Sequence, residues 1–153
     1  MPNHVRQQIR EAFAAQVTGL VTSGARVFQS RFYNMAETDL PGLKIYTEQE
    51  EIADNAGTTY QASPDLQRRT ISLRCEAVAR ATANLDDTLD KMCNEVEKAI
   101  AANPTLGGLC KVQCWLVSTD INMDDGSDRP TGNAVMVWKI VVLTMSNTPD
   151  VAL

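Results

Sequence analysis

The stretch GNAVMVWKIVVLTM, residues 132–145, is apolar on both of the faces that a β-strand would give it. Its only charged residue is Lys139. Because the side chains of a strand alternate between two faces, the large apolar residues divide into two sets: Val135, Val137, Val141 and Leu143, and Met136, Trp138, Ile140 and Val142. A strand of this kind must be covered on both sides. Two helices can cover one face of a small sheet, and we expect a partner subunit to cover the other.

A second strand-like run, KVQCWLVSTDI at 111–121, comes before this stretch, and together they predict a long hairpin. An acidic loop at about 120–132 joins them and contains DINMDDGSD at 120–128. From Asp120 the order D-x-N-x-D resembles the start of a calcium-binding EF-hand loop.

Three features argue against a specific calcium site in this loop. The glycine falls at the seventh position instead of the sixth, and Thr131 stands where the motif requires a bidentate glutamate. The flanking segments are strands, whereas the motif requires helices. We therefore expect a solvated hairpin loop, and we keep its four aspartates only as candidates for weak cation binding: Asp120, Asp124, Asp125 and Asp128.

Two other segments, 5–21 and 85–102, have the apolar spacing of amphipathic helices. Asn3 and Asn84 are their expected N-caps. Extended stretches are predicted at 25–33, 40–51 and 68–79. We therefore expect an α+β fold in the order α-β-β-β-α-β-β, with a mostly antiparallel or mixed sheet and two helices packed on one of its faces.

Length and charge narrow the class of protein. The 153 residues fit a single domain, 1–153, with a polar loop at about 53–67. A net charge of −5 argues against a protein that grips nucleic acid, since phosphate binding needs clustered Lys and Arg. The sequence shows no apolar run of signal-peptide or membrane-span length. We therefore expect cytosolic synthesis and four reduced cysteines that pack as small hydrophobic residues.

No residue pattern predicts catalysis or a cofactor. The only histidine, His4, stands near the start of the chain, and nothing in the sequence pairs it with a cysteine. Cys110 and Cys114 are spaced C-x-x-x-C without a second ligand pair for zinc. We therefore expect no enzyme activity and no cofactor.

Several arginines lie in or beside the predicted strands. They could pair with acidic residues across strands on a wet sheet face, or they could form salt bridges between subunits. The spacing favours neither alternative. Three of these arginines join residues of the doubly apolar strand and of the acidic loop in the candidate interface set: Val135, Val137, Lys139, Val141, Arg68, Arg69, Arg74, Asp124 and Asp125.

The order of these pieces carries a family resemblance over nearly the whole chain. It begins with the helix HVRQQIREAFAAQV and continues through RVFQSRFYNMAETDLPGLKIYTEQEE, in which an acidic segment and a Leu-Pro turn lead into a short strand. The strand RRTISLRCEAVAR, the helix LDDTLDKMCNEVEKAI and the closing hairpin with its acidic tip follow. In this order the chain resembles the tail terminator (minor tail, tail completion) proteins of long-tailed bacteriophages, the group that includes the lambda tail terminator.

This resemblance implies a structural role. Such proteins form hexameric rings on the last ring of the tail tube, stop its polymerisation and present a surface to the head connector. The implied partners are further copies of the chain, the tail tube protein and the head-completion or connector protein, with no membrane. DNA would pass through the lumen without specific binding, and no catalytic residue or cofactor belongs to the role. The implied location is the host cytoplasm during assembly and then the head-proximal end of the virion tail.

Two alternatives stay open at this stage. One is another phage neck, connector or tail tube component with a related fold. The other, from a different class, is a small cytosolic ligand- or metal-binding module that uses the acidic loop. The strand at 135–143 argues against the second, because a monomeric module should not leave such a strand uncovered.

Overall fold

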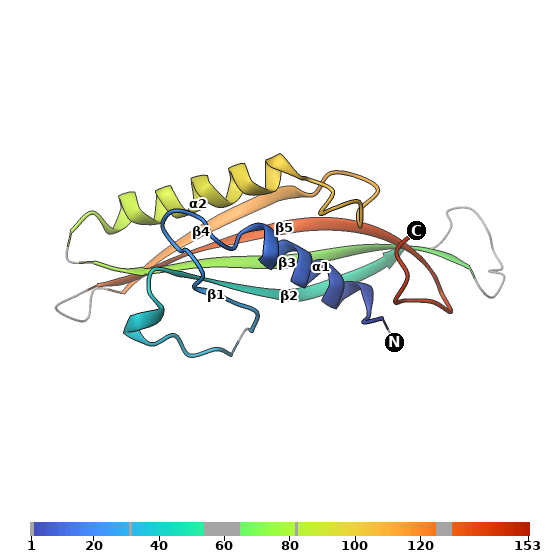
Figure 1. Cartoon of the computed structure of the whole chain (residues 1–153), viewed down its shortest axis with the longest axis horizontal. Helices are drawn as coiled ribbons and strands as arrows, with labels where there is room; N and C mark the ends of the chain where they lie inside the picture. The colour runs from blue at the N-terminus through green and yellow to red at the C-terminus, as the bar shows by residue number, and fades with distance from the viewer. Residues whose placement is uncertain (1, 31, 54–64, 82, 125–129) are drawn as a thin grey trace.

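The computed structural model describes residues 2–30, 32–53, 65–81, 83–124 and 130–153 (Figure 1). It contains two α-helices, one short 3-10 helix (η1) and five strands in this part of the chain. Their bounds are α1 Val5–Gln16, β1 Val27–Phe28, η1 Glu37–Asp39, β2 Gly42–Ala53, β3 Leu66–Arg80, α2 Leu85–Ala102, β4 Trp115–Asp124 and β5 Thr131–Met145. Apart from η1, this order confirms the predicted α+β class and the order α-β-β-β-α-β-β.

The strands form one sheet in the order β1-β2-β3-β5-β4. β1 runs parallel to β2, and the other neighbours are antiparallel. β3 and β5 pair over their whole lengths, from Leu66 opposite Met145 to Arg80 opposite Thr131. Both helices lie on the same side of the sheet, with α1 contacting β2 and α2 contacting β3 and β5 (Figure 1). No helix in the described residues is both long and apolar enough to cross a membrane.

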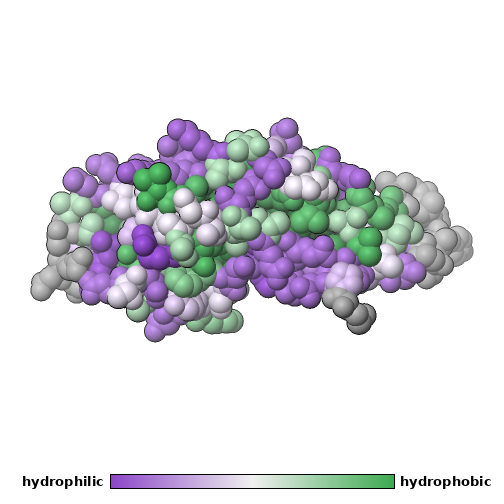
Figure 2. Space-filling model, viewed as in Figure 1, coloured by the Kyte–Doolittle hydropathy of each residue, from purple (hydrophilic) through white to green (hydrophobic). Residues whose placement is uncertain are grey.

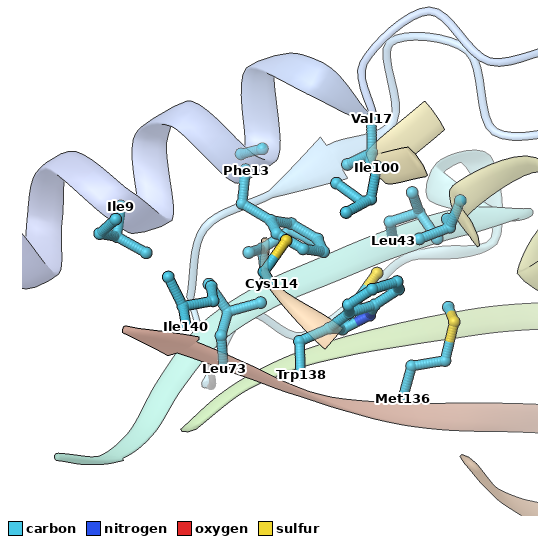
Figure 3. Packing of buried hydrophobic residues seen from close by; sticks show 14 of the residues in the cluster. Ile9, Phe13, Val17, Leu43, Leu73, Ile100, Cys114, Met136, Trp138 and Ile140 are labelled. Carbon is cyan, nitrogen blue, oxygen red and sulfur yellow. The ribbon is translucent and has the colours of Figure 1, made fainter. Parts of the chain in front are cut away.

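The core lies between this face of the sheet and the two helices. The ring of Phe13 in α1 meets that of Trp138 in β5 edge-on, with centroids 5.7 Å apart, and Ile100 of α2 lies close by (Figure 3). On this face the core contains Met136, Ile140 and Val142 of β5 and Ile71 and Leu73 of β3. On the outside of this helix-covered half, hydrophobic residues form separate patches among hydrophilic ones (Figure 2).

Two of the predicted elements are shorter than expected. α1 ends at Gln16, whose side-chain amide donates to the carbonyl oxygens of Ala99 and Asn103, each at 2.9 Å. It thereby caps the end of α2, whose last carbonyls lack partners within the helix. The predicted strand 25–33 is reduced to Val27–Phe28, because the chain turns back and the ring of Tyr33 stacks on that of Phe28 at 4.2 Å.

The two predicted loops are also bounded differently. β4 continues through Asp124 and β5 begins at Thr131, so the strands of the hairpin reach into the predicted loop at 120–132. The polar loop at 53–67 is shortened in the same way, since Ala53 belongs to β2 and β3 begins at Leu66. Residues 54–64 and 125–129 lie outside the described part of the chain.

Both predicted N-caps need correction. His4, not Asn3, precedes α1, and its Nδ1 accepts a hydrogen bond from the Arg6 backbone N–H at 3.1 Å. Asn84 does precede α2, but it adopts a left-handed conformation with φ of 59°, and its side chain makes no capping hydrogen bond. An N-cap normally has an extended backbone that aims its side chain at the first turn, and this conformation does not provide it.

The His4 cap predicts a pH-dependent stability. Burial, followed by the charge of Arg6, lowers the pKa of His4 below its usual 6.5. The capping Nδ1 must stay unprotonated to accept its hydrogen bond. The cap therefore contributes fully above pH 6.5, and its contribution is lost as the pH falls through the lower folded-state pKa. Urea unfolding between pH 7 and pH 5, about the range in which histidine titrates, should show a falling free energy of unfolding.

The variant His4→Asn provides the control for this effect. Asparagine keeps a capping oxygen but does not titrate. Since His4 is the only histidine, the variant should lose most of the pH dependence in this range. An unchanged slope would show that the cap is not its source.

Candidate functional site

The outer face of β5 was expected to need a partner subunit. The structure places Val135 between Glu76 of β3 and Asp120 of β4, and Val141 opposite Thr70 of β3. Val135 and Val141 are only 7% and 3% exposed within the single chain. The argument from an uncovered face therefore does not hold at these two positions, because the single chain already buries the valines. Their place in a subunit interface stays a prediction.

The other two outer-face candidates on β5 are partly buried. Val137 lies opposite Arg74, and Lys139 donates from Nζ to Ser72 Oγ at 2.6 Å. The single charge of the strand therefore has a partner inside the chain. The roles of Val137 and Lys139 in an interface stay predictions.

Arg69 lies on the helix side of the sheet and is 5% exposed. Its Nη1 contacts Glu50 Oε1 at 2.8 Å, and its Nε donates to Thr144 Oγ1 at 2.8 Å. Arg6 of α1 reaches the same Glu50 oxygen at 3.4 Å. This buried pair joins β2, β3 and the start of α1, so Arg69 is not available to a second subunit.

The other two arginine candidates are more exposed. Arg74 pairs with Glu48 of β2 at 2.6 Å, and this hydrogen bond is the main cause that raises the pKa of the guanidinium. Arg69 and Arg74 therefore both form cross-strand ion pairs within the chain. Arg68 is exposed at the same end of β3, and its place in a subunit interface stays a prediction.

The acidic candidates fall into two groups. Asp120 and Asp124 are exposed on β4, and their register with Val135 and Thr131 places them on the outer face together with Asn122. Asp125 and Asp128 lie outside the described residues. Within the described residues, no three His, Cys, Asp or Glu side chains gather as a metal site. Weak cation binding by this loop stays a prediction.

The four cysteines are free, and burial raises the pKa of every thiol. The pKa of Cys93 rises to about 11 and that of Cys110 to about 12, and those of Cys75 and Cys114 are raised as well. A thiol acts as a nucleophile only as its thiolate. These thiols are therefore protonated at neutral pH and pack as small core residues.

The feature that stands out most in the structure is the free edge of β4, which was not predicted from the sequence. Nine of its ten residues are exposed, and only Leu116 is partly buried. Four large apolar side chains on this strand are 43–52% exposed: Trp115, Val117, Ile121 and Met123. The signal was present as Ser118, Thr119, Asp120 and Asn122, because polar residues on both faces of a strand are typical of an edge.

A pocket of about 450 Å³ adjoins this edge, between the end of α2 and the start of β4. Its lining is mainly apolar, and we call it the Trp138 pocket; it includes Ile100, Ala101, Pro104, Trp115, Leu116 and Trp138. Trp138 is 4% exposed, and its indole N–H has no hydrogen-bond partner among the described residues. β4 and this pocket together form the candidate assembly surface.

The buried pair predicts a large stability difference between two arginines of the same strand. Arg69→Met leaves the Glu50 carboxylate buried without its main partner, which should lower the free energy of unfolding by about 3 kcal/mol. Arg74→Met breaks a pair whose side chains are both 32% exposed, so the loss should stay below about 1 kcal/mol. Urea denaturation measures both.

A double variant separates the lost pair from lost packing. Arg69→Met combined with Glu50→Leu removes both charges and should recover much of the stability that the single Arg69→Met variant loses. If the two arginine variants are equally stable, the buried pair contributes no more than the exposed one.

No protein-family model matches the chain, and no curated protein matches it in sequence. Among solved structures, the chain is similar to one from a structure described as the virion of a native gene transfer agent (GTA) particle. The two chains share 16% of their residues over 90% of this chain and 92% of that chain, with a TM-score of 0.42.

Proposed function

We propose that this chain is a structural protein of a phage-like particle that caps the tail tube as a ring. In this role it stops polymerisation of the tube and provides the surface on which the head is joined. The observation that carries the proposal is the free edge of β4, a ten-residue strand with four half-exposed large apolar side chains. The assignment to a tail terminator, rather than to another assembling protein, rests on the sequence resemblance.

An edge of this kind favours self-assembly. It presents unpaired backbone N–H and C=O groups, and soluble proteins commonly protect such edges with charge, proline or a covering segment. The free part of β2 at the other side of the sheet carries Glu48 and Glu51, whereas the first half of β4 exposes Trp115 and Val117. The two edges therefore differ in chemistry, and β4 is the better surface for a neighbouring subunit.

Different surfaces on the two sides of one chain favour head-to-tail contacts. Such contacts close into rings when the rotation between neighbours allows it. We take the hexameric stoichiometry from the resemblance alone. The partners in this proposal are further copies of the chain, the tail tube protein and the head-completion or connector protein. Assembly would take place in the host cytoplasm, and the ring would then lie at the head-proximal end of the virion tail.

The charge of the chain suits the proposed channel. The net charge is −5, and exposed Asp120 and Asp124 lie on the outer face of β4. Negative charge facing a lumen would repel the DNA backbone, so DNA could pass without being held. Neither enzyme activity nor a cofactor is part of this proposal.

A tail tube or neck component is the nearest alternative, and tube growth distinguishes it. Purified chain added to growing tubes of its cognate tube protein should cap them, so negative-stain electron microscopy should show shorter tubes as the amount of chain rises. A tube component would instead extend or be built into the tubes. A chain that leaves tube length unchanged contradicts the capping role.

The role of β4 predicts the effect of new charges on its edge. Val117→Lys with Ile121→Lys places two charges in each proposed contact, which should abolish ring formation because lysines on an edge strand oppose pairing and a charge is costly to bury in an apolar contact. The side chains are 51% and 52% exposed, so the thermal midpoint of the isolated chain should change little. Light scattering and thermal melts measure the two effects.

The matched control is Val21→Lys with Val151→Lys. These residues are 86% and 44% exposed, in the turn after α1 and in the C-terminal segment, so the charge and the number of substitutions are the same. The control should assemble like the wild type. If it is equally defective, added charge and not the β4 edge controls assembly.

A further inference from the structure

The lining of the Trp138 pocket indicates which kind of side chain it can accept. Most of the lining is apolar, and Glu97, Lys98 and Gln113 supply its polar part. The indole N–H of Trp138 is buried, so the pocket offers apolar contact area to an incoming group. The fitting occupant is therefore an apolar side chain.

The chain itself displays such a side chain at the opposite edge of the sheet. Phe32 follows β1 and is 91% exposed, more than any other large hydrophobic residue among the exposed ones. Single exposed apolar residues are common, but this one stands on a braced segment. The adjacent Tyr33 stacks on Phe28, and its hydroxyl donates to Asp39 Oδ2 at 3.1 Å. The same carboxylate oxygen accepts from the Ala36 backbone N–H at 2.9 Å.

This bracing reduces the entropic cost of inserting Phe32 into a partner, because Tyr33 beside it is already held in place. The pocket is large enough, since a cavity of about 150 Å³ admits benzene and this one measures about 450 Å³. The projecting residue lies on the β1 side of the sheet and the pocket lies on the β4 side.

We propose that Phe32 of one copy inserts into the Trp138 pocket of the next copy. The contact is head-to-tail, because each copy donates Phe32 at one side and offers its pocket at the other. This inference deepens the proposed function and rests on its self-assembly. It names the residue and the pocket that join neighbouring subunits.

Tryptophan fluorescence reads the pocket directly. The chain has two tryptophans, Trp115 and Trp138, and both line it. Assembly on raising the concentration should shift the emission together with the mass in solution. Phe32→Ser should abolish both changes by weakening association at least about thirtyfold, as expected for an aromatic hot spot. Val21→Ser is the matched control, since Val21 is 86% exposed elsewhere and should not matter.

A mixing experiment tests the direction of the contact. Phe32→Asp removes the inserted residue, and Ala101→Phe fills the pocket from an exposed position on α2. Each variant alone should stay monomeric. Mixed in equal amounts they should form a dimer and nothing larger, because one intact Phe32 can then meet one intact pocket. Circular dichroism melts should show both variants folded.

Several outcomes would overturn the inference. They are assembly of either variant alone, a mixture that stays monomeric or forms rings, emission that does not change on assembly, and a wild-type chain that never self-associates. Tube capping is measured separately. If the Phe32→Asp variant still caps tail tubes, only the proposed Phe32 contact is overturned. If the chain assembles through Phe32 but does not cap tubes, only the proposed tail role is overturned.

Discussion

The packing of β5 between β3 and β4 is the constraint on which the rest of the structure depends. β5 pairs with β3 along its full length, and its helix-side residues carry the core that both helices cover. The edge-on contact between Trp138 and Phe13 connects α1 to this strand. Because β5 occupies an interior position, β4 must form the edge of the sheet.

The position of β4 connects the fold to the proposed assembly. An interior strand can be apolar on both faces. The inner face of β5 packs against the helices, and Val135 and Val141 of its outer face are buried between the neighbouring strands. β4 pairs with a neighbouring strand along one edge only, and its large apolar side chains remain about half exposed. The pocket between α2 and β4 extends this surface into the core, as far as Trp138. β4 therefore presents its surface to a neighbouring subunit because β5 takes the interior position in the sheet.

Periodicity predicted the elements whose pattern is strong. The helix at 85–102 was predicted correctly, since one dominant apolar face determines it. Cross-strand pairing of the arginines was one of two open alternatives, and their partners were not predicted because these are far apart in sequence. The aromatic stack of Phe28 on Tyr33 was not predicted either, since a local turn creates it. For a related reason, the interface was predicted mainly on β5, whereas the structure exposes β4. Hydrophobicity indicates which strand is buried, whereas strand order, which the sequence does not show, decides which strand is the edge.

Hydrogen exchange along β4, compared between dilute and assembled chain, tests the central claim most directly. In an antiparallel edge strand, alternate amides point away from the neighbouring strand and exchange freely. If β4 is the assembly surface, these amides should exchange fast in the monomer and become protected as the mass rises, while amides of β3 stay protected throughout. Amides on β4 that still exchange fast in fully assembled rings would contradict the account.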